Sequence, residues 1–508
     1  MQIEQEIKFR LPTAAASRFW RLTRRAGAPR QRKVSSVYYD TAKHHLRRHG
    51  ASVRLRRDAS KWLQTLKLEA APSAGYSARA EWESPARRAE LDLSRFPREE
   101  IMAATGLDLA RLPKLRPVFE TRFVRRSSAV AIDGETRAEI SVDRGYVAAG
   151  GRREEISEVE VELKAGDAEA LLRYAAELAA PLGLELEFES KAERGYRLAA
   201  GDAFPRPRKW RRPSLGALAT PSEAFVAICT AALAQTGGNA RGVVHASDSE
   251  YLHQMRVGLR RLRSALRAFR ALVPKKAAKP IVARLRDLVP SLGAARDWDV
   301  FCEGLVRISV QEPERAPVLG QLLARARGKR AGARRRARAV AGSAKMQAVL
   351  IRILRWLNAR PWKDRAGNAE TSLVRFAAQA LDELQRKALK EADDIDWSDA
   401  ARRHQLRIRI KRLRYACDFF AGSFPGSLAQ PYLKRLAALQ DILGDLNDVA
   451  VARRFLAELA PRGSPAELAG AAAYVARAHA VRERVLVTSL QPAWKEFGKR
   501  RRFWTAGT

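Results

Sequence analysis

Polar and apolar residues alternate with a period of two in many short runs of the first 200 residues. Such runs lie at 3–9, 52–57, 62–69, 79–83, 119–125, 139–143 and 157–164. This period predicts half-buried strands, which form a mainly antiparallel sheet. Helical patterns interrupt the strands at 14–26, 98–105 and 167–182, so the class predicted for this part is α+β.

The pattern changes after residue 200. Residues 201–217 contain three prolines and many charges, which predicts a linker between a domain at 1–200 and a domain at 218–505. From about Thr220 the apolar period becomes 3.6, with Ala, Leu and Arg dominating. This half is predicted to be all-α.

The helical half contains an internal repeat. Residues 253–263 match 404–414, and residues 292–300 match the stretch that begins at Leu443. Both matches have an offset of 151 residues, so the distance from the histidine to the following Leu-Gly is 39 in each copy. Two motifs with one offset indicate a duplicated unit of several helices.

The net charge of the chain indicates what kind of partner it binds. The 508 residues include 95 Lys and Arg against 56 Asp and Glu, for a net charge of +39. Residues 1–200 hold 37 basic and 29 acidic side chains, and residues 201–508 hold 58 and 27. An excess of this size predicts a polyanionic partner: nucleic acid, an acidic membrane surface or a phosphate-rich ligand.

Cysteine and hydropathy narrow the setting. Three scattered cysteines, Cys229, Cys302 and Cys417, exclude a disulfide framework and a zinc site. No stretch of about 18 apolar residues occurs, and the N-terminus reads as a strand instead of a signal peptide. These features predict a cytoplasmic protein without a membrane span.

The strands of the first half carry charge on one face. Period-2 spacing places Glu4, Glu6 and Lys8 together, and a single strand of this kind is most often part of a half-solvated sheet. The pattern nevertheless recurs with both signs over many strands. If they curl into a barrel with this face inward, carboxylates for Mg²⁺ or Mn²⁺ lie beside cations for phosphate oxygens.

The Glu4, Glu6, Lys8 triplet resembles the ExExK signature of the CYTH domain, the triphosphate tunnel metalloenzymes, over residues 1–200. Further matching stretches are 38–41, 53–56, 66–69, 158–164 and 190–196. The resemblance implies an antiparallel eight-stranded tunnel that grips a linear triphosphate, while one or two divalent metal ions, Mg²⁺ or Mn²⁺, place a water for attack.

Residue roles follow from the same resemblance. The implied phosphate ligands are Lys8, Arg54, Arg56, Lys67, Arg122, Lys191 and Arg194. The implied metal ligands are Glu4, Glu6, Glu160 and Glu162, with Asp143, Glu81 and Glu158 as further candidates. Substrates within the family include inorganic triphosphate, thiamine triphosphate, an RNA 5′ end and ATP, and fusion to a helical domain resembles the bacterial inorganic triphosphatases.

Each repeat of the helical half carries a basic stripe beside an apolar one. The first stripe is His253, Arg256, Arg260, Arg263, Arg267 and Arg270, and the second is His404, Arg407, Lys411 and Arg414. One such stripe is typical of a solvated face. Two stripes, each headed by a histidine, favour a bound polyanion, because like charges at this spacing destabilise a helix.

This second pattern resembles the CHAD domain, the conserved-histidine α-helical domain, over residues 218–505. The resemblance implies two pseudo-symmetric four-helix bundles and a basic surface that binds inorganic polyphosphate. Acidic residues of the second motif in each repeat are expected to cap helices or to position the arginines. They are Asp297, Asp299, Asp445 and Asp448.

Three hypotheses about function remain. The first is a metal-dependent inorganic triphosphatase whose helical half binds polyphosphate, in the cytoplasm and associated with polyphosphate granules. The second keeps polyphosphate docking without catalysis. The third is a nucleic-acid binder, which is less favoured because aromatic residues are not interleaved with the arginines.

Overall fold

The computed structural model describes residues 2–23, 28–58, 61–68, 75–86, 89–215, 219–362, 372–393, 395–499 and 501–505. Glu69 of one motif stretch and residues 216 and 217 of the predicted linker lie outside this set. The chain divides into two compact units. Unit 1 holds residues 1–211, 233–242 and 343–360, and unit 2 holds the rest. Within the described residues, no helix combines the length and the apolar character needed to cross a membrane.

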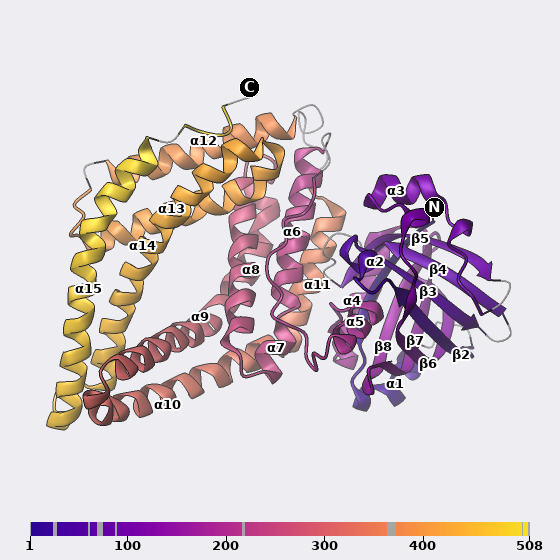
Figure 1. Cartoon of the computed structure of the whole chain (residues 1–508), viewed down its shortest axis with the longest axis horizontal. Helices are drawn as coiled ribbons and strands as arrows, with labels where there is room; N and C mark the ends of the chain where they lie inside the picture. The colour runs from indigo at the N-terminus through magenta and orange to yellow at the C-terminus, as the bar shows by residue number, and fades with distance from the viewer. Residues whose placement is uncertain are drawn as a thin grey trace. The chain divides into compact units, whose positions relative to one another are not determined.

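Unit 1 is built around a closed antiparallel barrel (Figure 1). Its strands are β1 (Gln2–Arg10), β2 (Arg30–Asp40), β3 (Ala51–Asp58), β4 (Lys61–Leu68), β5 (Tyr76–Ala86), β6 (Arg116–Ala131), β7 (Arg137–Ala149) and β8 (Arg152–Ala165). The order is β5-β4-β3-β2-β6-β7-β8-β1, and β1 also pairs with β5. That last pairing closes the sheet on itself. A short strand β9 (Glu185–Leu186) extends the same edge of β1.

The two faces of the barrel wall differ in character. Helices α2 (His45–Arg48) and α3 (Arg98–Thr105) lie on the outer face of β3 to β5, where Val53, Leu66 and Trp82 form an apolar core with Ile101. Helix α4 (Ala168–Leu182) contacts β8 and β1. Helix α1 (Ala16–Leu22) begins two residues later than predicted, and residues 24–26 of that prediction lie outside the described set. The helices expected at 98–105 and 167–182 are confirmed.

Helix α5 (Lys191–Ala199) packs against β6 and β7 and fills part of the barrel interior. Tyr196 and Ala192 join Tyr38, Phe119 and Phe123 in an inner apolar core. A Cβ atom on Gly195 would lie 2.0 Å from the ring of Phe119, so only glycine lets the helix approach the strand this closely. Ser190 and Glu193 form a capping box that fixes where α5 begins.

Unit 2 is helical, which confirms the all-α class predicted for this half. Its helices include α8 (Ser249–Ala268), α9 (Lys275–Gln311), α10 (Ala316–Ala341), α12 (Leu373–Ala392), α13 (Ala400–Phe420), α14 (Gly426–Leu459) and α15 (Ala466–Gly498). Helix α6 (Pro221–Gly237) spans the division between the units. Helix α11 (Ala344–Ala359) lies in unit 1, and α7 (Ala240–His245) is divided between the units after Gly242.

The two repeats correspond to two consecutive helix sets, α8-α9-α10 and α13-α14-α15. The basic stripes lie on α8 and α13, which contact each other. The second motifs lie in the middle of the long helices α9 and α14. Trp298 of α9 stacks on Phe455 of α14 with ring centroids 3.7 Å apart, which joins the two sets through their cores.

Candidate functional site

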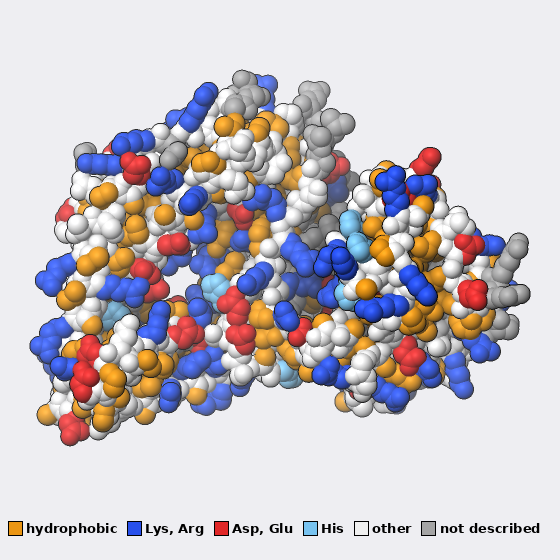
Figure 2. Space-filling model, viewed as in Figure 1, with side chains coloured by type: hydrophobic (Ala, Val, Ile, Leu, Met, Phe, Trp, Pro, Cys, Tyr) orange, Lys and Arg blue, Asp and Glu red, His pale blue; other side chains and the backbone are white. Residues whose placement is uncertain are grey.

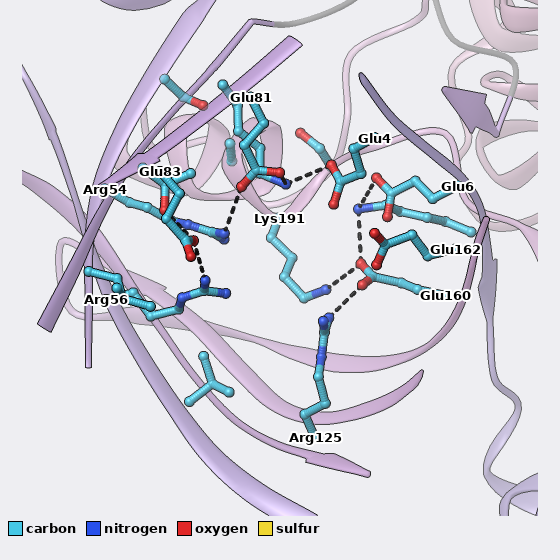
Figure 3. A pocket seen from close by; sticks show the side chains of 18 of the residues that line it. Glu4, Glu6, Arg54, Arg56, Glu81, Glu83, Arg125, Glu160, Glu162 and Lys191 are labelled. Carbon is cyan, nitrogen blue, oxygen red and sulfur yellow. Dashed lines mark hydrogen bonds and ion pairs between the residues drawn. The ribbon is translucent and has the colours of Figure 1, made fainter. Parts of the chain in front are cut away.

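A cavity of about 390 Å³ occupies the barrel interior. Its lining includes the alternate residues of β1, Glu4, Glu6 and Lys8, as the period-2 pattern predicted. Figure 3 shows cations and carboxylates facing one another across this space. The described lining residues include eight Lys and Arg and seven Glu. The cavity is therefore a region of mixed charge in which the two signs nearly balance.

Cations on β3 and β4 contact carboxylates on β1 and β5. Lys67 Nζ lies 2.7 Å from Glu4 and 3.0 Å from Glu81. Arg54 lies 3.8 Å from Glu81, and Arg56 pairs with Glu83. Burial alone would raise the pKa of Glu4, but the positive charge of Lys67 holds it below its usual value. Arg54, Arg56 and Lys67 therefore line the cavity while they are paired with carboxylates.

A second group of charges lies where α5 meets the inner face of β7 and β8. Lys191 Nζ lies 2.8 Å from Asp143 and 2.9 Å from Glu160, and it also contacts Glu158. Burial would raise the pKa of Glu158, but Lys191 and Arg194 lower it to about 2. The same carboxylates raise the pKa of Lys191 against the effect of burial. Lys191 therefore stays charged at any physiological pH.

A row of carboxylates crosses three neighbouring strands on the inner face. Glu6 of β1 lies directly opposite Glu162 of β8, which lies opposite Glu139 of β7. Burial raises the pKa of Glu162, and the charges of Glu4 and Glu6 act in the same direction against its partner Lys164. Like charges directly opposite one another destabilise a sheet unless a cation compensates them.

This row has the chemistry of a divalent metal site. Carboxylate oxygens are the ligands that Mg²⁺ and Mn²⁺ prefer, and the crowded negative charge would be relieved by such an ion. A second set, Asp143, Glu158 and Glu160, places one oxygen of each residue within 4.8 Å of the others. Cations contact both groups of carboxylates: Lys191 and Arg125 contact that set, whereas Lys8 lies 3.1 Å from Glu6 and Lys164 lies 2.6 Å from Glu162 in the row.

Most residues proposed from the sequence for phosphate and metal lie at this cavity. Lining it are Lys8, Arg54, Arg56, Lys67 and Lys191, together with Glu4, Glu6, Glu81, Glu160 and Glu162. Asp143 and Glu158 do not line the cavity; they are buried in contact with Lys191, which does line it. Arg194 is also buried there, and it pairs with Glu158 and Glu187.

Arg122 is the exception, and its expected position in the tunnel is wrong. It lies opposite Ser35 and Tyr146 on the outer face, where it pairs with Glu120 at 3.0 Å and its side chain is 58% exposed. On β6 the inner face carries the odd-numbered residues Phe119, Thr121, Phe123 and Arg125. The apolar residues point inward here because they pack beneath α5.

The cavity contains residues that the sequence did not single out as ligands. They include Arg32, Tyr38, Glu83, Arg125, Glu139 and Lys164. Arg125 donates to Asp143 at 2.7 Å and contacts Glu160, so it takes the inward position expected of Arg122. The β6–β7 register, which pairs Arg125 with Asp143, is the feature that would have identified it.

Unit 2 brings the two basic stripes together. We call Arg256, Arg260, Arg407 and Lys411 the basic seam; the first two lie on α8 and the others on α13. Burial and the charges of Arg407 and Arg260 lower the pKa of Lys411 to about 7. Burial also lowers the pKa of Arg407, against the attraction of Asp448. Figure 2 shows many further Lys and Arg side chains on the visible face of this unit.

Other stripe residues lie apart from the seam. Arg263 and Arg267 face Arg412 of α13, while Arg414 lies 3.9 Å from Asp441 and near Arg261. His404 is exposed. His253 is half-buried, and its pKa is lowered by burial and by the charge of Arg296. The seam therefore contains four of the ten stripe residues.

The acidic residues of the second motifs position arginines. Asp297 lies 3.4 Å from Arg256, and Asp299 accepts from Arg330 and Arg334. Asp445 accepts from Arg482 at 2.8 Å. All four acids of these motifs lie inside the long helices α9 and α14 instead of at an N-terminus, so the capping alternative is wrong.

Family models match both halves of the chain: the CYTH domain at residues 2–196 and the CHAD domain at residues 227–457. A solved CHAD domain from the plant Ricinus communis is 31% identical with a TM-score of 0.50, and the match covers 59% of this chain and 98% of that one. A structure from Hippeastrum, described as a putative adenylyl cyclase with a dominant triphosphatase activity, is 18% identical with a TM-score of 0.31 over 40% of this chain and 98% of that chain.

Among curated proteins, an inorganic triphosphatase from Haemophilus influenzae is 27% identical over 172 residues. The matching segment is 33% of this chain and 46% of that protein. The chain thus matches just under half the length of this curated relative.

Proposed function

We propose, for a chain that belongs to the CYTH and CHAD domain families, that the barrel cavity of unit 1 hydrolyses inorganic triphosphate with a divalent metal ion. The similarity to an inorganic triphosphatase supports this choice of substrate. The proposal includes a second part, that the basic seam of unit 2 binds inorganic polyphosphate.

The charge balance of the cavity carries the first part. A triphosphate has several negative charges, and eight cations against seven carboxylates leave an excess of only one positive charge to neutralise them. A purely basic pocket would bind the anion without help, whereas this one needs added positive charge at its carboxylates. Divalent ions supply that charge, so the same feature that admits triphosphate also predicts metal dependence.

The residues divide the work by position. Arg54, Arg56 and Lys67 on one wall and Arg125 and Lys191 on the other would exchange their carboxylate partners for phosphate oxygens. Guanidinium groups suit this exchange because they bind two oxygens at once. Glu6, Glu162 and Glu139, with Glu4 and Glu160, would hold the metal. When bound, the metal polarises the phosphoryl group and lowers the pKa of the attacking water.

The cavity offers little to a nucleoside. Its two lining aromatic residues are Tyr38 and Phe123. Tyr38 is stacked on Phe119 with centroids 4.4 Å apart, and Phe123 is covered by Lys191 with its Nζ 5.1 Å from the ring centroid. A base would find no free aromatic face in the part of the lining that the structure describes. This favours an inorganic chain over a nucleotide.

Phosphate release from triphosphate, thiamine triphosphate and ATP tests the enzyme proposal directly. With Mg²⁺ or Mn²⁺ present we expect inorganic triphosphate to be cleaved at least about ten-fold more efficiently than either organic substrate, and EDTA to abolish the reaction. Cleavage that is unaffected by EDTA would contradict the charge argument. A preference for ATP would reject the substrate.

Two arginines three positions apart on β6 provide a matched pair. We expect Arg125→Gln to reduce kcat/KM for triphosphate by about 100-fold or more, because a charged donor to the reacting group is lost. Arg122→Gln should stay within about two-fold of the wild type, because Arg122 lies outside the barrel. Thermal melting of both variants controls for folding. Equal losses in the two variants would contradict the assignment of the inner face.

The seam supports the second part of the proposal. Arg260, Arg407 and Lys411 form no ion pair with any carboxylate that the structure describes, although they are partly buried beside one another. A polyanion would relieve this repulsion.

Competition between long-chain polyphosphate and duplex DNA for the full-length chain tests which polyanion unit 2 binds. A preference for DNA would support the nucleic-acid hypothesis instead, and polyphosphate binding would be consistent with attachment to polyphosphate granules.

A further inference from the structure

A second basic pocket lies in unit 2, between α8, α12 and α13. It has a volume of about 230 Å³. Its charged lining residues are Arg267, Arg270, Glu383, Lys387, Arg409 and Arg412. Five cations thus surround one carboxylate. We call this feature the α12 pocket, and of its lining only Arg267 and Arg270 belong to the stripes read from the sequence.

The acids near the α12 pocket do not reach all of its cations. Glu383 contacts Arg270 and lies 2.6 Å from Lys387. Arg409 pairs with Glu391 at 3.2 Å. Arg267 and Arg412 form no ion pair with any described carboxylate, and each faces other cations. Burial and the charges of Arg267 and Arg409 lower the pKa of Arg412 to about 10.

The internal repeat shows what these positions look like when they are neutralised. At an offset of 151 residues, Arg412 corresponds to Arg261 and Arg267 corresponds to Asp418. Arg261 and Asp418 form an ion pair at 3.0 Å. Where α8 and α13 cross, one pair of repeat-related positions holds an ion pair between Arg261 and Asp418. The other pair holds Arg412 and Arg267, which are both positively charged.

Further repeat-related positions differ in the same direction. Arg270 corresponds to Ala421, and Arg409 corresponds to Gly258. On the α12 side of this crossing, three arginines stand where the repeat-related residues are not basic. One of those repeat-related residues, Asp418, is an acid. Mutual repulsion of this kind is costly in the free protein, which is consistent with a site that an anion completes.

We propose that the α12 pocket is a second, one-sided phosphate-binding site, which holds a segment of a polyphosphate chain where the repeat-related crossing holds the carboxylate of Asp418. The inference rests on the proposed polyphosphate binding and adds a site outside the basic seam. From Arg260 to Arg267 the rise along α8 is about 10 Å, at 1.5 Å per residue. One chain could therefore contact both sites.

The test restores the missing acid. Arg267→Asp recreates the arrangement of Arg261 and Asp418 opposite Arg412, so we expect a higher Tm than in the wild type. Affinity for long-chain polyphosphate, measured by calorimetry on the full-length chain at fixed salt and without divalent metal, should fall at least about ten-fold. A gain in stability with a loss of binding is not expected from simple damage to the fold.

Arg335→Asp is the matched control. Arg335 is exposed on α10 and lines none of these sites, and its substitution changes the net charge by the same amount. We expect a loss of affinity below about three-fold from this variant. Arg412→Gln provides a second test at the pocket, which should weaken binding about as much as Arg267→Asp without adding an acid.

The outcomes separate this inference from the broader proposal. If the wild type does not bind polyphosphate, both are rejected. If it binds and Arg267→Asp weakens binding no more than Arg335→Asp, only the α12 pocket is rejected. If Arg267→Asp weakens binding and Lys411→Gln does not, the pocket stands and the seam loses its assigned role.

Discussion

Replacing Glu6 with glutamine is expected to slow triphosphate hydrolysis by about three orders of magnitude, equivalent to about 4 kcal/mol of activation free energy. Glu6 is 2% exposed on the inner face of β1, opposite Glu162 and 3.1 Å from Lys8. Glutamine keeps the volume of the side chain and removes its charge, so the metal would lose a ligand while the wall keeps its packing. The measurement is the initial rate of phosphate release as a function of Mg²⁺ and Mn²⁺ concentration.

The metal dependence distinguishes ligand loss from general damage. For Glu6→Gln we expect the metal concentration needed for half-maximal rate to rise at least about ten-fold. Glu120→Gln is the control, because Glu120 pairs with Arg122 on the outer face of the barrel. Equal rates for Glu6→Gln and the wild type would reject the tunnel as the catalytic site.

Polyphosphate binding is expected to weaken steeply as the pH rises above 7, and Lys411 is the cause. Its pKa is about 7 in the free chain, because burial and the charges of Arg407, Arg260 and Arg256 outweigh the attraction of Asp448. A bound polyanion favours the charged form, so binding takes up a proton above pH 7. Affinity should then fall by up to about ten-fold per pH unit for the one proton taken up.

Stability and affinity should depend on pH with opposite signs. Between pH 7 and the usual Lys pKa of 10.5, the unfolded chain binds more protons than the folded one at this position. The free energy of unfolding therefore rises with pH through this window, while polyphosphate affinity falls. Calorimetry in buffers of different ionisation enthalpy should show close to one proton taken up at pH 8.

Two substitutions at this position separate charge from titration. Lys411→Gln should bind more weakly at pH 7 and lose most of the pH dependence between pH 7 and 9. Lys411→Arg should keep the affinity at pH 7 with a flatter profile, because a guanidinium resists deprotonation. A wild-type profile that stays flat from pH 7 to 9 would contradict the role of Lys411.

Period-2 spacing grouped Glu4, Glu6 and Lys8 on one face of β1, and these three residues line the cavity. It failed on β6, where Phe119 and Phe123 point inward to pack with Tyr196. A strand pattern shows which residues share a face, but not which face is inside. That choice depends on α5, whose contacts come from a segment far along the chain.

Helix α5 was not predicted because its buried face includes basic residues and so lacks the usual apolar pattern. Lys191, Arg194 and Arg197 are all buried, which is rare for basic residues without partners. Their partners include Glu158 and Glu154, which lie more than 30 positions away. The residues of the basic seam could be predicted from the sequence repeat in unit 2. The α12 pocket could not, because the sequence does not show which residues of α8, α12 and α13 lie side by side.

Barrel closure through β1 has a consequence for how the domain folds. The first strand pairs with β5 on one edge and with β8 on the other, so both edges are satisfied only after residue 165 has been made. Such long-range pairing is slow because the loop between the partners must close first. We expect ribosome-bound chains that end before β8 to remain sensitive to protease, and chains that extend past α5 to become resistant. The carboxylates proposed as metal ligands come from both ends of this segment, so they assemble only in the last step of barrel formation.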